Sequence, residues 1–208
     1  MKVLLINGSP NEHGCTFTAL NEVAGSLNKN GIDTEIFWIG KKAIQGCIAC
    51  MKCFELGRCV FDNDGVNKLS ARLNEFDGYI IGSPVYYAGP AGSLCAFLDR
   101  LFFSGDETKF FHKPGACIVS CRRGGASAAF DRLNKYFTIR NMPIVSSQYW
   151  NQVHGNTPEE VKQDLEGMQT MRTLGENMAW LLKCIEAGKK AGIDYPKLEE
   201  WTATNFIR

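Results

Sequence analysis

Near the start of the chain, residues 3–10 read Val3-Leu4-Leu5-Ile6-Asn7-Gly8-Ser9-Pro10, a continuous apolar run that stops at a glycine and a proline. Such a run is typical of a β-strand that is buried on both faces. In residues 15–28, which follow, apolar side chains recur at spacings of three and four, and this predicts an amphipathic helix. A buried strand joined to a helix by a short loop is the basic unit of an α/β fold.

The same alternation continues along the chain. Further apolar runs predict strands at residues 34–39, 78–82, 116–120 and 143–146. Helical spacing predicts helices near residues 65–74, 92–103 and 130–139, and from residue 158 to about residue 187. Because strands joined through helices run parallel, we expect a five-stranded parallel sheet with helices on both faces. Five strands fit the doubly wound, flavodoxin-like order 2-1-3-4-5 better than a six-stranded dinucleotide-binding fold.

The length and composition are those of one folded domain. The chain has 208 residues, 45% of them hydrophobic and 22% charged, which is enough to build a full core. We expect the domain to span residues 1–190, with a cysteine-rich insertion at about residues 44–64 and a tail at residues 191–208. The tail is polar and contains Pro196, so we expect it to form an arm that packs on a partner subunit.

The charge and hydropathy of the chain exclude several classes of partner. A formal net charge of +1 gives no electrostatic reason to expect nucleic acid or an anionic membrane. No run approaches the roughly 18 apolar residues of a membrane span. The apolar run at residues 3–6 is shorter than the roughly 7–15 residues of a signal peptide's apolar region. We therefore expect a cytoplasmic protein.

The first candidate site loop is Gly8-Ser9-Pro10-Asn11-Glu12-His13-Gly14-Cys15-Thr16. It joins a strand to a helix N-terminus, where backbone N–H groups and the helix dipole favour an anion. The side chains of Ser9, Asn11 and Thr16 can add donors to a phosphate. The alternative is an ordinary turn in which a serine or threonine caps the helix. The loop is not Gly-x-Gly-x-x-Gly and lacks a P-loop lysine, so dinucleotide and P-loop interpretations are weak.

Two further loops fall at strand ends. The second runs from Gly82 to Pro90 and includes Pro84, Val85, Tyr86 and Tyr87, which can present a flat apolar surface to a planar ring. The third is Ser120-Cys121-Arg122-Arg123-Gly124-Gly125, in which glycines allow close backbone approach and an arginine can favour an electron-rich ring. The alternatives are a rigid turn whose tyrosines cap the core and a solvated basic turn.

Together the three loops resemble the NADPH-dependent FMN reductase branch of the flavodoxin-like superfamily. The matching elements are Gly8-Ser9-Pro10, Gly14-Cys15-Thr16, Gly82-Ser83-Pro84-Val85-Tyr86, Leu98-Asp99-Arg100 and Arg123-Gly124-Gly125, which cover roughly residues 1–185. The resemblance implies that the FMN phosphate binds the first loop at Ser9, Asn11, Gly14, Cys15 and Thr16. It implies that the isoalloxazine lies between two sets of residues: Pro84, Val85, Tyr86 and Tyr87 on one side, and Ser120, Arg122, Arg123, Gly124 and Gly125 on the other. It also implies a homo-oligomer with the flavin near the subunit interface.

One departure from the family pattern lies in the first loop. Family members often carry an arginine where this chain has Asn11. The phosphate would then depend more on backbone amides, and we expect a modest affinity for FMN.

Four cysteines gather within a short segment, Cys47-x2-Cys50-x2-Cys53-x5-Cys59. Two consecutive x2 spacings let one loop bring three thiolates together, as in ferredoxin cluster loops. Structural zinc sites more often use two separated pairs. The segment closely resembles the cysteine motif of the iron–sulfur flavoproteins, and that resemblance implies a [4Fe–4S] cluster on these four residues. The alternative is a structural loop with free thiols or a labile disulfide, since spacing does not establish occupancy.

The loop from Tyr149 to Gly155 follows the last predicted strand. It can wall the ring or a nicotinamide pocket, and the alternative is that its aromatic residues simply pack.

Our first hypothesis for function is an enzyme in which NAD(P)H reduces FMN and the electrons pass to a small-molecule or small redox-protein acceptor. The flavin carries that chemistry, so no catalytic acid or base is assigned. The first alternative is an iron–sulfur flavoprotein electron carrier, and the second is a flavin-binding sensor without turnover. We expect a homodimer or homotetramer.

Overall fold

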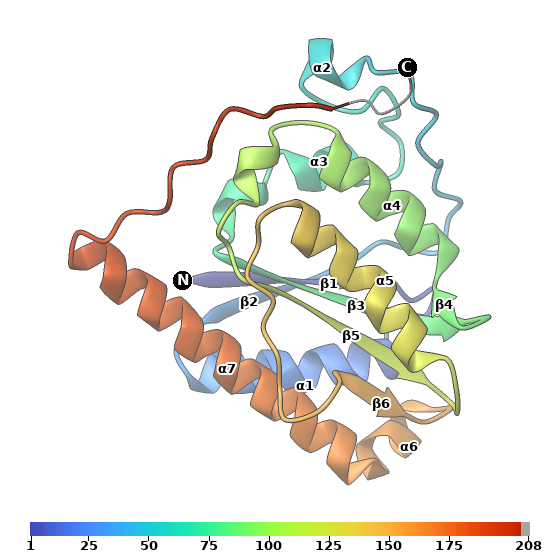
Figure 1. The fold of residues 1–208 in the computed structure, drawn as a ribbon. Coiled ribbons are helices and arrows are strands. Elements are labelled where there is room, and N and C mark those ends of the chain that lie inside the picture. The colour runs from blue at the N-terminus through green and yellow to red at the C-terminus, as the bar shows by residue number, and fades with distance from the viewer. Residues whose placement is uncertain (205–208) are drawn as a thin grey trace.

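The computed structural model describes residues 1–204 and has a central sheet between two layers of helices (Figure 1). The strands of the sheet are β1 (Lys2–Asn7), β2 (Asp33–Trp38), β3 (Gly78–Tyr86), β4 (Gly89–Pro90), β5 (Gly115–Cys121) and β6 (Gln152–His154). The α-helices are α1 (Cys15–Lys29), α2 (Cys53–Leu56), α3 (Val66–Ser70), α4 (Gly92–Phe103), α5 (Ala126–Ile139), α6 (Pro158–Gln163) and α7 (Leu165–Lys190). Two 3-10 turns, Leu73–Glu75 and Glu107–Lys109, complete the elements.

The sheet has the predicted doubly wound order. Its parallel strands lie side by side as β2-β1-β3-β5-β6, while the two-residue β4 pairs antiparallel with the end of β3. In sequence order the parallel strands therefore follow 2-1-3-4-5, as predicted. The register runs from Lys2 opposite Asp33 through Val3 opposite Gly78 to Tyr79 opposite Gly115. The order in which successive strands are added reverses between β1 and β3, and this switch point is where α/β sheets of this type bind ligands.

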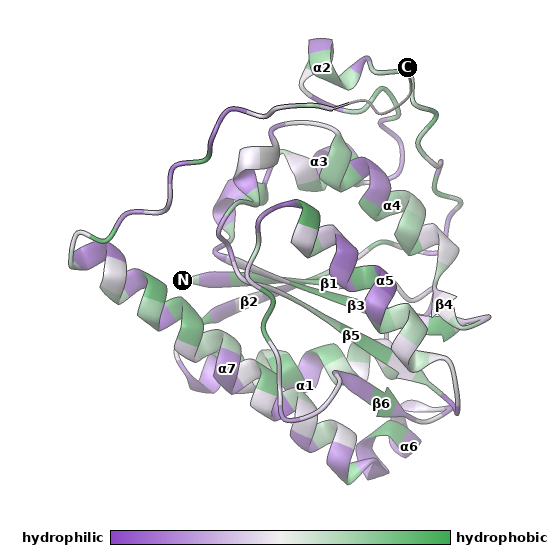
Figure 2. Cartoon of the chain, in the orientation of Figure 1, coloured by the Kyte–Doolittle hydropathy of each residue, from purple (hydrophilic) through white to green (hydrophobic). Residues whose placement is uncertain are grey.

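The core is divided by the sheet. Val3 and Leu5 of β1 pack with α1, α6 and α7, whereas Leu4 and Ile6 pack with α3, α4 and α5. Alternate side chains of a strand point to opposite faces, so a strand covered on both faces is apolar throughout. Figure 2 shows the same pattern, with β3 and β5 mostly green between helices that alternate green and purple.

The predicted strand at residues 143–146 was wrong. This segment makes only an isolated bridge between Gly115 and Ile144, and the fifth parallel strand is β6, further along the chain. The polar residues after Val145 leave the sheet, and the Asn151 side chain then donates to the carbonyl of Cys117 at 3.1 Å. This side-chain hydrogen bond stands where a backbone hydrogen bond between neighbouring strands would otherwise form, and β6 begins at the next residue, Gln152.

The predicted helix over residues 158–187 is two helices. Asp164 ends α6 and begins α7, with its Oδ1 accepting from the N–H of Gly167 at 2.9 Å. Its Oδ2 accepts from the N–H of His154 at 2.7 Å. The carboxylate therefore ties β6 to the break between the helices.

The predicted tail is described only as far as residue 204, and residues 205–208 lie outside the described part. Within that part it contains no regular element, and Tyr195 stacks on His112 with ring centroids 4.6 Å apart. Among residues 1–204, every helix is too short or too polar to cross a membrane.

Candidate functional site

The carboxyl ends of β1, β3, β5 and β6 meet at one edge of the sheet and surround a cavity of about 250 Å³. Nine of the predicted cofactor-binding residues line it: Ser9, Asn11, Cys15, Thr16, Pro84, Val85, Tyr86, Ser120 and Arg122. Gly14, Tyr87, Arg123, Gly124 and Gly125 were also predicted to bind the cofactor, but they are not among the lining residues. The structure therefore brings all three predicted loops to one place.

The first loop is held by its own polar groups. The N–H of Ser9 donates to Asn7 Oδ1 at 3.1 Å, and the N–H of Asn11 donates to Ser9 Oγ at 3.1 Å. Helix α1 then begins with Gly14 at its N-cap, which lacks any side-chain cap, and with no acidic residue in the first turn. The first N–H groups of the helix are thus open to an anion. This geometry favours the anion site over the capped turn.

Trp38 fixes this loop from the next strand, a contact that sequence reasoning missed. Its Nε1–H donates to the carbonyl of Ser9 at 2.8 Å. Because Trp38 ends β2, the strand beside β1, the loop is anchored to the sheet. The sequence signal was a tryptophan at the carboxyl end of a predicted strand.

The second loop is a tight β-hairpin. Tyr86 pairs with Gly89 across the turn, and Tyr87 and Ala88 have φ values of 49° and 57°. Two successive left-handed residues are the mark of the type I′ turn that suits the twist of a hairpin. The turn leaves Tyr86 at the cavity and Tyr87 fully exposed beyond it.

The third loop touches this hairpin through Gly125. This residue has a φ of 92°, and a Cβ built on it would lie 2.7 Å from the Cα of Ala88. Only glycine fits both the conformation and the approach. Gly125 therefore sets the distance between the two loops, while Arg122 supplies the loop's positive charge to the cavity.

Three lining residues were not predicted as cofactor-binding residues: Cys121, Gly155 and Asn156. Cys121 Sγ lies 3.5 Å from His154 Nδ1, and burial raises the pKa of its thiol. Gly155 and Asn156 follow β6; Gly155 ends the loop that was weighed as a wall of the site, and Asn156 lies just beyond it. Because the fifth strand was predicted at residues 143–146 and not at β6, the sequence did not indicate that Gly155 and Asn156 lie at the cavity.

The predicted metal ligands share a second, smaller cavity. Cys47, Cys50, Cys53 and Cys59 all line a space of about 20 Å³ that also touches α4. Between them, Ala49 and Met51 have left-handed φ values of 51° and 58°, so the loop folds back on itself. The N–H of Ala49 donates to Cys47 Sγ at 3.5 Å. Among residues 1–204, no three Cys, His, Asp or Glu side chains stand close enough together to hold a metal ion.

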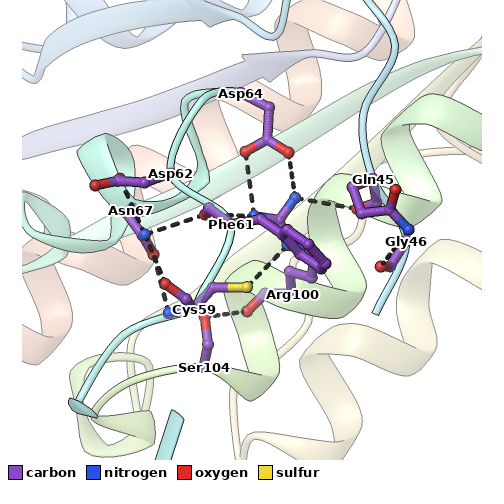
Figure 3. A network of polar contacts seen from close by, with 9 residues as sticks. All are labelled: Gln45, Gly46, Cys59, Phe61, Asp62, Asp64, Asn67, Arg100 and Ser104. Atoms are coloured by element: carbon purple, nitrogen blue, oxygen red, sulfur yellow. Dashed lines mark hydrogen bonds and ion pairs between the residues drawn. The ribbon is translucent and has the colours of Figure 1, made fainter. Parts of the chain in front are cut away.

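Cys59 is held by hydrogen bonds from both its backbone and its sulfur (Figure 3). Its N–H donates to Asn67 Oδ1 at 3.0 Å, and its carbonyl accepts from Asn67 Nδ2 at 2.9 Å. Its Sγ accepts from the Nε–H of Arg100 at 3.1 Å. It is buried, whereas Cys47 and Cys50 are exposed.

The donor groups present are of the kinds that the two implied cofactors need. An uncapped helix N-terminus beside the buried hydroxyls of Ser9 and Thr16 suits a phosphate. Pro84, Val85 and Tyr86 offer an apolar wall. Four thiols around one cavity are the donor set of a [4Fe–4S] cluster, and the N–H groups of Ala49 and Arg100 already bond to two of the sulfurs.

Comparison with known proteins agrees with this geometry. The family model described as NADPH-dependent FMN reductase matches residues 1–157. An iron–sulfur flavoprotein of Methanocaldococcus jannaschii is 31% identical over 193 residues, which cover 89% of this chain and all of the relative.

Solved structures support the fold. The structure of RosB with a bound 8-demethyl-8-formylriboflavin 5′-phosphate intermediate has a TM-score of 0.70 at 16% identity, covering all of this chain and 94% of RosB. The WrbA-like flavodoxin of Agrobacterium tumefaciens has a TM-score of 0.61 at 16% identity, covering 88% of this chain and 97% of its own. With its family match and its three loops at the switch point, the chain belongs to the NADPH-dependent FMN reductase family and is an FMN-dependent oxidoreductase of flavodoxin-like fold.

Proposed function

We propose that this oxidoreductase is an electron-transfer flavoprotein that holds a [4Fe–4S] cluster on Cys47, Cys50, Cys53 and Cys59 in addition to FMN. The observation that carries the proposal is that all four cysteines line one cavity. The full-length relative from Methanocaldococcus jannaschii, named an iron–sulfur flavoprotein, supports the same assignment. The cluster exchanges single electrons when bound, and FMN exchanges one or two.

The chain's own residues bind and orient these groups. The first turn of α1 and the hydroxyls of Ser9 and Thr16 would hold the FMN phosphate. Pro84, Val85 and Tyr86 would exclude water from one side of the ring. The guanidinium of Arg122 places a positive charge at the cavity, which favours an electron-rich ring. No residue is assigned as an acid or base.

A second candidate function is direct reduction by NAD(P)H. The description of the matching family favours it. In that case FMN held in the cavity would supply hydride chemistry with a nicotinamide, and the cysteines would serve as structural or thiol groups. In both cases we propose a small molecule or small redox protein as the acceptor.

We also propose a homodimer or homotetramer. The hairpin and the loop before β6 expose large aromatic side chains, namely Tyr86, which lines the cavity, and Tyr87, Tyr149 and Trp150. Exposed aromatic groups of this kind are enriched in protein interfaces.

The test is anaerobic purification followed by an absorption spectrum and analysis of iron and acid-labile sulfide. About four irons per chain together with flavin would support the cluster assignment. Flavin without iron, also after anaerobic reconstitution with iron and sulfide, would overturn it. Anaerobic addition of NADH or NADPH then tests the second candidate. If either nucleotide is the electron donor, it must reduce the flavin, and the flavin absorption must bleach at a rate fast enough for catalytic turnover.

A further inference from the structure

Arg100 is buried in the third turn of α4 and is only 1% exposed. A buried guanidinium is costly unless every donor is paired. The hydrogen-bond partners of its guanidinium therefore indicate which groups this buried site binds. Figure 3 shows the residues around it, among them Cys59 of the cysteine segment and Asp64 of the loop before α3.

The donors of this guanidinium can be counted. Arginine has five N–H groups. Asp64 accepts from both terminal nitrogens, one bond being 3.2 Å long, and the Asp64 side chain is itself only 5% exposed. The carbonyls of Gln45 and Phe61 accept two more, at 3.0 and 2.8 Å. One donor is left, Nε–H, and it points at Cys59 Sγ at 3.1 Å.

A sulfur is an unusual partner for a buried guanidinium. A thiol is a weak acceptor, whereas a metal-bound thiolate carries negative charge and accepts a charge-assisted hydrogen bond. Since Asp64 and two carbonyls satisfy the other donors, the bond to Cys59 makes the network complete. In the rest of the motif, Cys47 and Cys50 lie in an exposed loop.

We propose that Arg100 is the positioning residue of the cluster site: its Nε–H holds the sulfur of Cys59 as the fixed ligand and withdraws charge from it. This inference rests on the proposed cluster. Hydrogen bonds to ligand sulfurs raise the reduction potential of an iron–sulfur cluster, because they stabilise the added electron. Arg100 thus makes the cluster easier to reduce.

The first test compares the cluster potential of the holoprotein with those of two variants, by redox titration followed by EPR. Arg100→Lys keeps the positive charge but cannot hold Asp64 and Cys59 together, so the cluster should become harder to reduce. We expect about a tenfold change in its reduction equilibrium, or about 59 mV for one electron. Asp64→Asn disturbs the same network but removes a negative charge near the cluster. Because a nearby negative charge opposes reduction, the cluster potential of this variant should not fall. FMN content and the flavin potential should be unchanged in both.

A second measurement leaves Arg100 intact. Holoprotein labelled with ¹⁵N-arginine should show a nitrogen coupling to the reduced cluster in pulsed EPR, and Arg58→Lys should retain that coupling. This measurement decides the question if Arg100→Lys does not keep its cluster.

The outcomes separate two failures. A wild-type protein without iron and sulfide would overturn the proposed cluster. A wild-type protein with a full cluster, but with no nitrogen coupling or with a potential that Arg100→Lys leaves unchanged, would overturn the role of Arg100 alone.

Discussion

Thr16 and Ser120 are 104 residues apart in the chain, yet their hydroxyl oxygens lie 2.8 Å apart at the wall of the flavin cavity. Both side chains are buried. The bond joins the start of α1 to the end of β5 across the edge of the sheet. It therefore couples the loop that would bind the phosphate to the loop that would face the ring.

Replacing Thr16 by valine should weaken FMN binding. The valine keeps the shape of the side chain but leaves Ser120 without this partner, at a cost of about 1 kcal/mol or roughly fivefold in Kd. Quenching of flavin fluorescence on titration into the apoprotein measures it. Thr34→Val is the matched control, because that hydroxyl bonds to Asn28 at an exposed site on β2. Equal affinities for the two variants would contradict the role of Thr16.

Replacing Gly125 by alanine should destabilise the protein and reduce its FMN content. The new Cβ would overlap Ala88 at 2.7 Å in a left-handed conformation, which costs about 1–3 kcal/mol. Gly124→Ala is the control, since its Cβ would meet nothing within 4 Å. Urea unfolding and the flavin content of the purified variants provide the measurement. A Gly125→Ala protein as stable as Gly124→Ala would refute the close approach.

Removing one predicted ligand should remove the cluster. Cys50→Ser should lower the iron content from about four per chain to near zero while FMN stays bound, because the two cavities are lined by different residues. Cys184→Ser, an exposed cysteine on α7, should keep its iron. Iron, sulfide and flavin analyses of the same preparations test this. Full iron in Cys50→Ser would argue against Cys50 as a ligand.

Acid should selectively remove the stabilisation due to Glu35. Hydrogen bonds from Arg72, and further ones from Lys2, lower its pKa from 4.5 to about 2. A depressed pKa means that the stabilisation is present above pH 4.5 and is lost as the pH falls from there toward about 2. We expect Glu35→Gln to cost about 1 kcal/mol at pH 7, the scale for a partly exposed pair. The difference from wild type should shrink with falling pH.

Urea unfolding followed by circular dichroism at several pH values measures this difference. A matched control is Glu199→Gln, which lies in the exposed tail. A Glu35→Gln penalty that stays constant from pH 7 to pH 3 would show that the ion pairs do not contribute.

The break in the last helix shows how tertiary contacts refine local signals. Helical spacing continues past Asp164, so periodicity predicts one helix. Its carboxylate instead accepts from Gly167 and from the backbone of His154 on β6. An aspartate followed by a glycine three residues later was a local hint of an N-cap, but its second partner comes from a strand ten residues earlier.

The site shows the same division. The apolar run at residues 3–6, the glycines and prolines after the strands, and the spacing of the four cysteines are local features, and from them the α/β class, the strand order and the cofactor loops follow. Other features depend on long-range pairing. The backbone groups at the edge of β5 can pair with more than one later segment, and local sequence does not say which. Tertiary folding therefore decides that β6 pairs with β5 and that Gly155 and Asn156 line the cavity.

Arg100 is the clearest case. In the sequence it belongs to the family-matching element Leu98-Asp99-Arg100 on a predicted helix, and nothing in that element indicates that its side chain is buried. Its burial follows from the packing of α4 against a segment some forty residues earlier, where Asp64 and Cys59 complete its hydrogen bonds. The sequence established which residue types were available for redox chemistry. Packing established which of them meet, because burial forces every polar group to find a partner.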